Sequence, residues 1–344
     1  MVGSAGADEF YNLVVVGPGP SMSGKVRWKA FIKHLCTWWA ITLILAVVVF
    51  AIVSPDGCPN VGRCSAVHAE TNIIYNACAA SALGAVLVHE LVCLCLTYKS
   101  ARRAMHIIHN LRDTLIPPAL LCATLSVLFI QNVLFAGPTP WYANAMRLGD
   151  DNNMDGEPVY TVFYLEWLIN VPILLILAGR YALRRPMTEI TRPLVVTNVY
   201  IILSWAVYFI PSHAGRIVTV VVSFAMYGWC SFDMMRWVFR FRKEHPEAPL
   251  TGRPFLTITL IVIFGVYGVV YLCRLFGVLS AVGERMCYTA LDFSTKLMVS
   301  MAFAGLRSSH YHNMLLDMVV NTNTAFLRSL KKPEPAEQIG RAMS

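Results

Sequence analysis

The sequence predicts an all-α membrane protein with eight transmembrane helices. Hydrophobic residues make up 56% of the 344 residues and charged residues only 14%, which leaves too little polar surface for a soluble domain. Apolar runs of roughly 17–25 residues, the length that a helix needs to cross a bilayer, recur along most of the chain. Lysine and arginine gather between these runs, as expected for loops at a membrane surface.

The expected helices follow the apolar runs in chain order. They are 32–53, 73–98, 114–136, 158–182, 193–210, 216–240, 255–280 and 286–306. Short linkers at 211–215 and 281–285 predict antiparallel neighbours in a compact bundle. The first 24 residues lack the basic-then-apolar layout of a cleaved signal, so we expect the first run to be retained as a helix.

The distribution of basic residues predicts the orientation of the chain in the membrane. If the N-terminus is cytoplasmic, 22 of the 28 lysines and arginines fall in cytoplasmic segments or span ends, within 25–33, 99–112, 180–192, 236–253 and 307–341. Positive loops stay inside, so both termini are expected in the cytoplasm. The net charge of +8 is then a signal of topology, and we expect membrane lipid rather than nucleic acid as the partner.

The cysteines predict no metal site and at most one disulfide. Eight of the ten lie in or at the edge of predicted spans, where a free thiol behaves as a small apolar group. Cys58 and Cys64 share an expected outer loop. That side of a membrane is oxidising, so a bridge between them and two free thiols are both open alternatives.

A different pattern begins after Arg307. The residues at the seam are spaced three and four apart, as in a coiled coil, and are Leu316, Val319, Asn323, Phe326 and Leu330. Two interpretations are open: a two-stranded stem in a homodimer, or an amphipathic helix along the inner membrane face. A buried asparagine fixes register in dimers, and this favours the stem.

Lys296 is the residue that most needs a functional explanation. It lies within the apolar run 286–306, where an ionisable group costs roughly 2.5–3.5 kcal/mol on insertion scales and usually serves a function. A buried amine can condense with an aldehyde to form a Schiff base. Asp292, four residues earlier, shares its helix face, and Glu166 is a second acid deep in another span. The alternative is an ion pair that only ties two helices together.

These residues together resemble the microbial rhodopsins over about 73–307. The resemblance is carried by the lysine and aspartate in the last span, and by Glu166, Trp167 and Pro172 in a span four earlier. It implies all-trans retinal bound covalently to Lys296, with Glu166 and Asp292 as counterion and Trp167 against the polyene.

The resemblance also implies that one further span lines the retinal pocket. In "FGVYGVVY" the pocket residues would be Phe264, Tyr267, Gly268 and Tyr271. Of these, Tyr267 alone matches the family pattern literally, and this departure bears on retinal geometry and colour.

Other departures bear on mechanism. Family pumps carry an arginine where this chain has Phe163 and a carboxylate where it has Leu177. Without a carboxylate at Leu177, return of a proton from the cytoplasm would be slow, so sensing is favoured over pumping. Arg274 is a candidate electrostatic substitute for the arginine missing at Phe163.

The extra first helix and the C-terminal stem resemble the enzyme rhodopsins. The predicted organisation is a cytoplasmic tail at 1–31, an extra helix at 32–53, a rhodopsin domain at 73–307 and a linker at 308–344. The resemblance is greatest to rhodopsin phosphodiesterases, whose C-terminal effector domain hydrolyses cGMP and cAMP. We expect no catalytic residues in this chain, and an effector domain beyond Ser344. A rhodopsin guanylyl cyclase and a light-driven pump or channel are the alternatives.

Overall fold

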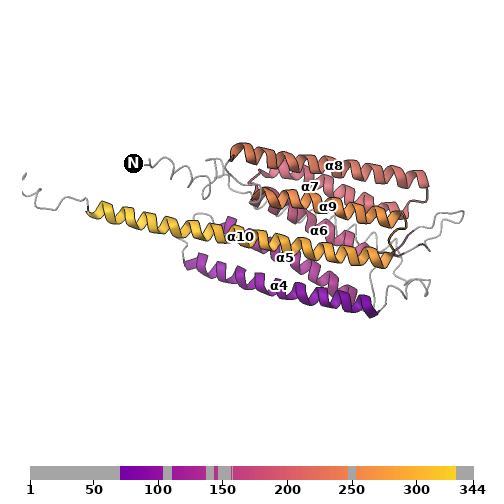
Figure 1. Cartoon of the computed structure of the whole chain (residues 1–344), viewed down its shortest axis with the longest axis horizontal. Coiled ribbons are helices and arrows are strands. Elements are labelled where there is room, and N and C mark those ends of the chain that lie inside the picture. The colour runs from indigo at the N-terminus through magenta and orange to yellow at the C-terminus, as the bar shows by residue number, and fades with distance from the viewer. Residues whose placement is uncertain are drawn as a thin grey trace, which may run out of the picture. The chain divides into compact units, whose positions relative to one another are not determined.

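The computed structural model describes residues 70–103, 111–136, 143–145, 156, 158–246 and 253–330. These residues are almost entirely helical, and Figure 1 shows the helices of the bundle running alongside one another. The expected helix at 32–53 and the pair Cys58 and Cys64 lie outside the described residues. The elements, in order, are α4 (Glu70–Arg103), α5 (Leu111–Ala136), β1 (Ala143–Asn144), β2 (Pro158–Val159), α6 (Thr161–Ile176), η3 (Leu177–Ala182), α7 (Met187–Ala206), η4 (Val207–Phe209), α8 (His213–Glu244), α9 (Arg253–Leu275) and α10 (Ala281–Leu330).

Six of the described helical stretches are long and apolar enough to cross a membrane. They correspond to the predicted spans from 73–98 to 255–280, and each is longer than or close to its prediction. A helix satisfies every backbone hydrogen bond within itself, which is why apolar segments of this length adopt it in lipid. The chain is therefore a multi-pass helical membrane protein.

α6 is the central helix of the bundle. In the most apolar window of the span Thr161–Ala182, 78% of residues are buried, against 17% in the windows of α4 and α8. Pro172 lies inside α6, and the chain continues from Ile176 into a π-helical turn at Leu177–Ala182. π-Helical turns are often found at functional sites. The central position of α6 places its side chains where several helices meet.

A short hairpin closes the connection before α6. Ala143–Asn144 pairs antiparallel with Pro158–Val159, a strand pairing that the sequence did not predict. The Gly156 N–H donates to the Ala145 carbonyl at 2.9 Å. A Cβ at Gly156 would lie 2.4 Å from that carbonyl oxygen, so this close backbone approach requires glycine.

The turn between the last two helices lies earlier than predicted. The linker was expected at 281–285, but α9 ends at Leu275 and α10 begins at Ala281. Gly277 has φ +72°, a conformation that glycine adopts readily and that ends α9. The Ser280 side chain then accepts a hydrogen bond from the Gly283 N–H at 3.1 Å, which caps α10. Glu284 and Arg285 therefore belong to a helix rather than to a loop.

α10 is a single helix of 50 residues, Ala281–Leu330. It contains both the predicted span 286–306 and the heptad pattern that ends at Leu330, so the helical character predicted for that pattern is confirmed. The chain divides into two compact units, and α10 contributes its residues up to Ala302 to the unit that contains the bundle and its residues from Phe303 to the other unit. Within the bundle, α10 contacts α4 through Tyr75, which donates to the Met286 carbonyl at 3.2 Å, and through Ser300, which donates to Glu90 at 2.8 Å.

Candidate functional site

The candidate site is built around Lys296 on α10. Its side chain is 3% exposed, so the amine is removed from bulk solvent. The amine Nζ lies 2.7 Å from Oδ1 of Asp292 and 2.9 Å from Oε1 of Glu166. An ionised group at bilayer depth is stable only when it is paired and hydrogen-bonded. The structure thus brings together the three ionisable residues predicted from the sequence.

Glu166, one of the two carboxylates at the Lys296 amine, lies on α6. The Glu166 side chain is 1% exposed and also accepts a hydrogen bond from the amide of Asn170, one helical turn later. The same amide donates to the Thr124 carbonyl of α5 at 3.2 Å. Asn170 thus fixes Glu166 and ties α6 to α5, which gives it a positioning role.

α9 supports the second carboxylate. The Tyr267 hydroxyl donates to Oδ1 of Asp292 at 2.6 Å, and the Lys296 amine donates to the same oxygen. The Asp292 side chain is completely buried. Because two donors converge on one oxygen, the position of Asp292 depends on α9 as well as on α10.

Aromatic rings form a wall beside the lysine. Trp167 of α6 packs edge-on against Tyr267 and Tyr288, with ring centroids 5.2 and 4.8 Å apart. Tyr267 and Tyr288 stack on each other at 5.8 Å. Edge-on and stacked rings of this kind give a rigid apolar surface. Such a surface suits a flat conjugated ligand.

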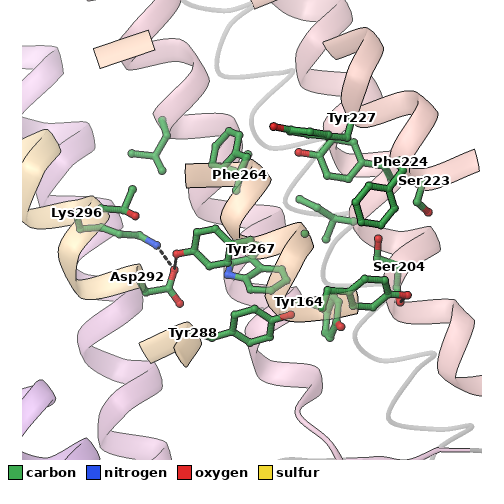
Figure 2. Close-up of a pocket in the computed structure, with 18 residues that line it drawn as sticks. Tyr164, Ser204, Ser223, Phe224, Tyr227, Phe264, Tyr267, Tyr288, Asp292 and Lys296 are labelled. Atoms are coloured by element: carbon green, nitrogen blue, oxygen red, sulfur yellow. Dashed lines mark hydrogen bonds and ion pairs between the residues drawn. The ribbon is translucent and has the colours of Figure 1, made fainter. Parts of the chain in front are cut away.

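A pocket extends from the lysine between α6, α7, α8, α9 and α10. Figure 2 shows Lys296 and Asp292 at one end, with aromatic side chains between them and the far end. Glu166 contacts the amine but does not line the pocket, and Pro172 is buried in α6 outside the lining. The predicted residues that do line it are Lys296, Asp292, Trp167, Phe264, Tyr267, Gly268 and Tyr271.

Several lining residues were not predicted from the sequence. Tyr288 had a detectable signal, because it lies four residues before Asp292 and eight before Lys296, on the same helix face. The remaining lining residues come from α6, α7 and α8, together with Thr295 of α10, and could be found only from the fold. They are Tyr164, Val171, Leu174, Tyr200, Ile201, Ser204, Ser223, Phe224, Tyr227 and Thr295.

A second group of buried charges lies near the start of α10. Arg274 Nε is 3.3 Å from Oε2 of Glu284, and both side chains are 6% exposed. Tyr208 donates to Glu284 at 3.4 Å, so α9, α10 and the turn after α7 meet at one carboxylate. The sequence did not predict this ion pair, because it placed Glu284 in a loop.

Arg285 is buried beside an aromatic cluster that includes Phe163. Its guanidinium lies 4.4 Å from the ring centroid of Phe135, which packs against Phe163 at 5.1 Å, and it donates to the Phe135 carbonyl at 3.0 Å. Burial raises the pKa of the neighbouring Tyr160, and Arg285 opposes that rise. Arg285 therefore places a cation against the aromatic cluster, whereas substitution of the missing arginine by Arg274 stays a prediction.

This combination of fold and site defines the class of protein. A bundle of membrane-spanning helices that encloses a lysine, two carboxylates and an aromatic pocket has the construction of a microbial rhodopsin. The sequence profile described as bacteriorhodopsin-like protein matches residues 119–308, more than half of the chain. The chain belongs to the bacteriorhodopsin-like family. No curated protein sequence matches the chain.

Solved structures with a similar fold include part of a rhodopsin phosphodiesterase and a proton-pumping rhodopsin. The transmembrane domain and linker region of Salpingoeca rosetta rhodopsin phosphodiesterase is 14% identical, with 88% of this chain and 92% of that chain covered and a TM-score of 0.64. The proton pumping rhodopsin AR2 of the marine alga Acetabularia acetabulum is 16% identical, with 71% and 96% covered and a TM-score of 0.55. At these identities the likeness establishes the fold.

Proposed function

We propose that the chain is a light sensor that holds all-trans retinal as a protonated Schiff base on Lys296. The observation that carries the proposal is a buried amine, 2.7 and 2.9 Å from two carboxylates, at the end of a pocket walled by aromatic rings. A long conjugated aldehyde matches this site. Its aldehyde can form a Schiff base with the amine, and its apolar chain and ring can occupy the aromatic pocket.

Retinal, when bound, supplies the absorption of visible light and a change of shape. The residues of the chain stabilise the charge, confine the ligand and accept the proton. Glu166 and Asp292 hold the positive charge at Nζ of Lys296 in a dry pocket, where a small displacement changes the electrostatic energy strongly. Trp167 and Tyr288 confine the ligand between flat faces. Glu166 is the proposed acceptor of the Nζ proton after illumination.

The side chain at position 177 favours sensing over pumping, because a pump needs a proton donor there to return a proton to the Schiff base. Leu177 is completely buried within the π-helical turn and offers no proton. A slow return of the proton prolongs the illuminated state, which suits a switch and limits a pump. We infer that a steady ion current is not the output of this chain.

The proposed output is regulation of a cyclic-nucleotide phosphodiesterase domain carried by the same polypeptide. Two observations support this proposal: the unbroken helix α10 contains Lys296 and continues to Leu330, and the fold resembles the transmembrane domain and linker region of a rhodopsin phosphodiesterase. Light would bias helix positions in the bundle, and α10 would pass the bias onward as a two-state element. Cytoplasmic termini and a homodimeric stem are parts of the same proposal.

The first experiment tests the attachment of the chromophore. Protein expressed without retinal and then supplied with all-trans retinal should develop a visible absorption band. Lys296→Met should abolish the band, whereas Lys99→Met, which changes an exposed lysine, should retain it. A Lys296→Met protein with an unchanged band would refute the assignment, as would an adduct located by mass spectrometry on another side chain.

The second experiment separates sensor from pump and identifies the effector. Voltage-clamped membranes containing the protein should show no steady photocurrent, and an appreciable one would favour the light-driven pump or channel. The full-length gene product should change its rate of cGMP or cAMP hydrolysis on illumination. Light-dependent synthesis of cGMP instead would identify a rhodopsin guanylyl cyclase.

A further inference from the structure

The end of the pocket away from Lys296 carries several hydroxyl groups. Tyr200 and Ser204 of α7 and Ser223 and Tyr227 of α8 line this region. Figure 2 places Ser204, Ser223 and Tyr227 on the side opposite to Lys296, with Tyr267 between. The far end therefore has hydrogen-bonding groups from two helices, where a hydrocarbon ring would need only apolar contacts.

Ser223 shows that this hydrogen-bonding capacity is not used within the described part of the protein. Ser223 is 2% exposed, and its Oγ has no hydrogen-bond partner among the described residues. Many helical hydroxyls of this chain bond to the carbonyl four residues earlier, as Ser126 does at 2.7 Å and Thr219 at 2.8 Å. A buried hydroxyl without a partner is costly, so a ligand atom that reaches it would be favoured.

The neighbouring groups fix the shape of this end. The Tyr227 hydroxyl donates to the Ile261 carbonyl at 2.8 Å, and the Tyr271 hydroxyl donates to the Ser204 carbonyl at 2.9 Å. Tyr200 packs edge-on against Tyr227 at 6.2 Å. These contacts join α7, α8 and α9 in the pocket that Ser223 also lines, so the positions of the polar groups are fixed by the fold.

We propose that this end of the pocket recognises an oxygen on the ring of the chromophore, so that the preferred ligand is a retinal with a ring hydroxyl or keto group. This inference rests on the proposed function, because it requires the aldehyde end to be attached at Lys296. A ring oxygen would accept from, or donate to, Ser223, with Ser204 as the second partner. An unsubstituted ring would leave the Ser223 hydroxyl without a partner.

A competition experiment tests the inference. Protein expressed without chromophore is incubated with equal amounts of all-trans-retinal and all-trans-4-hydroxyretinal, and in a second reaction with all-trans-3-hydroxyretinal in place of the 4-hydroxy compound. The bound chromophore is then extracted and quantified by chromatography. One good hydrogen bond predicts an enrichment of roughly threefold to tenfold for at least one hydroxylated aldehyde.

Single substitutions identify the residues responsible. Ser223→Ala should bring the ratio of bound aldehydes close to one, and Ser204→Ala should lower it. Ser126→Ala, a helical serine outside the pocket, should retain the enrichment.

Two results would overturn the inference while the proposed function stands: a visible band with retinal but no enrichment of either hydroxylated aldehyde, or an enrichment that neither pocket serine affects. The first result is also the one expected if a water molecule occupies the polar end. The absence of a band with every aldehyde would overturn the proposed function and the inference together.

Discussion

Glu166 and Asp292 contact the same amine but have different supports. Glu166 is held by Asn170 of its own helix, whereas Asp292 shares one oxygen between Lys296 and Tyr267. Both carboxylates stabilise a positive charge at Nζ, since opposite charges within about 4–6 Å favour the charged form. One carboxylate lies on α6 and the other on α10, so the charge at Nζ is held by side chains of two helices.

The charge balance at Lys296 leads to the first prediction. With retinal bound, Glu166→Gln should shift the visible band and cause the protonated form to be lost at a pH lower by about 1–3 units, because removal of an anion disfavours the cation. Asp292→Asn should act in the same direction. Absorbance titration in the dark measures both effects, with Glu189→Gln, which alters a carboxylate paired with Arg240, as control. An unchanged titration of Glu166→Gln would remove Glu166 from the counterion role.

At the residue scale, the sequence could predict the residues at the lysine and few of those farther along the pocket. Lys296 and Asp292 share a helix, so their spacing alone placed them together. The depth of Glu166 in its span made it a candidate acid, but its assignment to the counterion came from the family resemblance, because no periodicity links positions 166 and 296. Ser204 and Ser223 lie on different helices and are common residues in such spans, so their meeting at one end of a pocket is a property of the tertiary fold.

At the element scale, the π-helical turn after α6 packs tightly on two neighbouring helices. A Cβ added at Gly179 would lie 2.9 and 3.0 Å from two Ile190 side-chain carbons and 3.2 Å from Trp237. Ile190 belongs to α7 and Trp237 to α8, so there is little room for either to move. Gly179 thus permits a close approach of three elements.

The second prediction follows from this contact. Gly179→Ala should lower the free energy of unfolding by about 1–3 kcal/mol through overpacking. Gly228→Ala is the matched control, since nothing lies within 4 Å of a Cβ there, and it should be neutral or stabilising by up to about 1 kcal/mol. Detergent-induced unfolding of the purified protein measures both. Equal effects at Gly179 and Gly228 would contradict the packing argument.

The third prediction concerns the ion pair that joins α9 to α10. Arg274→Met should destabilise the protein by about 3–5 kcal/mol, because it leaves the Glu284 carboxylate buried without its cation. The double variant Arg274→Met/Glu284→Gln should recover much of that loss. The control is Arg236→Met, whose ion pair with Asp233 is partly exposed and should contribute about 1 kcal/mol or less. If the double variant is as unstable as the single one, the loss does not arise from an uncompensated charge.

Hydrophobicity predicted the six apolar spans well. Unpaired backbone groups are costly in lipid, and a single long apolar segment can pair its own backbone groups by forming a helix. The ends were harder to predict. The residues at 281–285 include Glu284 and Arg285, whose charges suggested a loop, yet both are buried in the first turns of α10. The partners that make this possible, Arg274 and Phe135, come from other helices and leave no local signal.

At the scale of the whole molecule, the proposed output depends on the part of α10 that begins at Phe303. The structure describes a helix up to Leu330, and the sequence gives that helix a seam with spacings of three and four that includes Asn323. Helicity agrees with a dimeric stem and equally with a helix on the membrane surface. An experiment on association is therefore needed to choose between them.

The fourth prediction makes that choice. An asparagine at a seam position lowers the stability of a coiled coil while fixing its register. Asn323→Leu should therefore strengthen self-association, so that the detergent-solubilised dimer persists to concentrations several-fold lower in sedimentation experiments. Asn321→Leu adds the same side chain two residues away, outside the seam, and should leave association unchanged. If both variants associate as the parent protein does, or equally more strongly, the seam does not hold a dimer and the interpretation as a helix on the membrane surface is preferred.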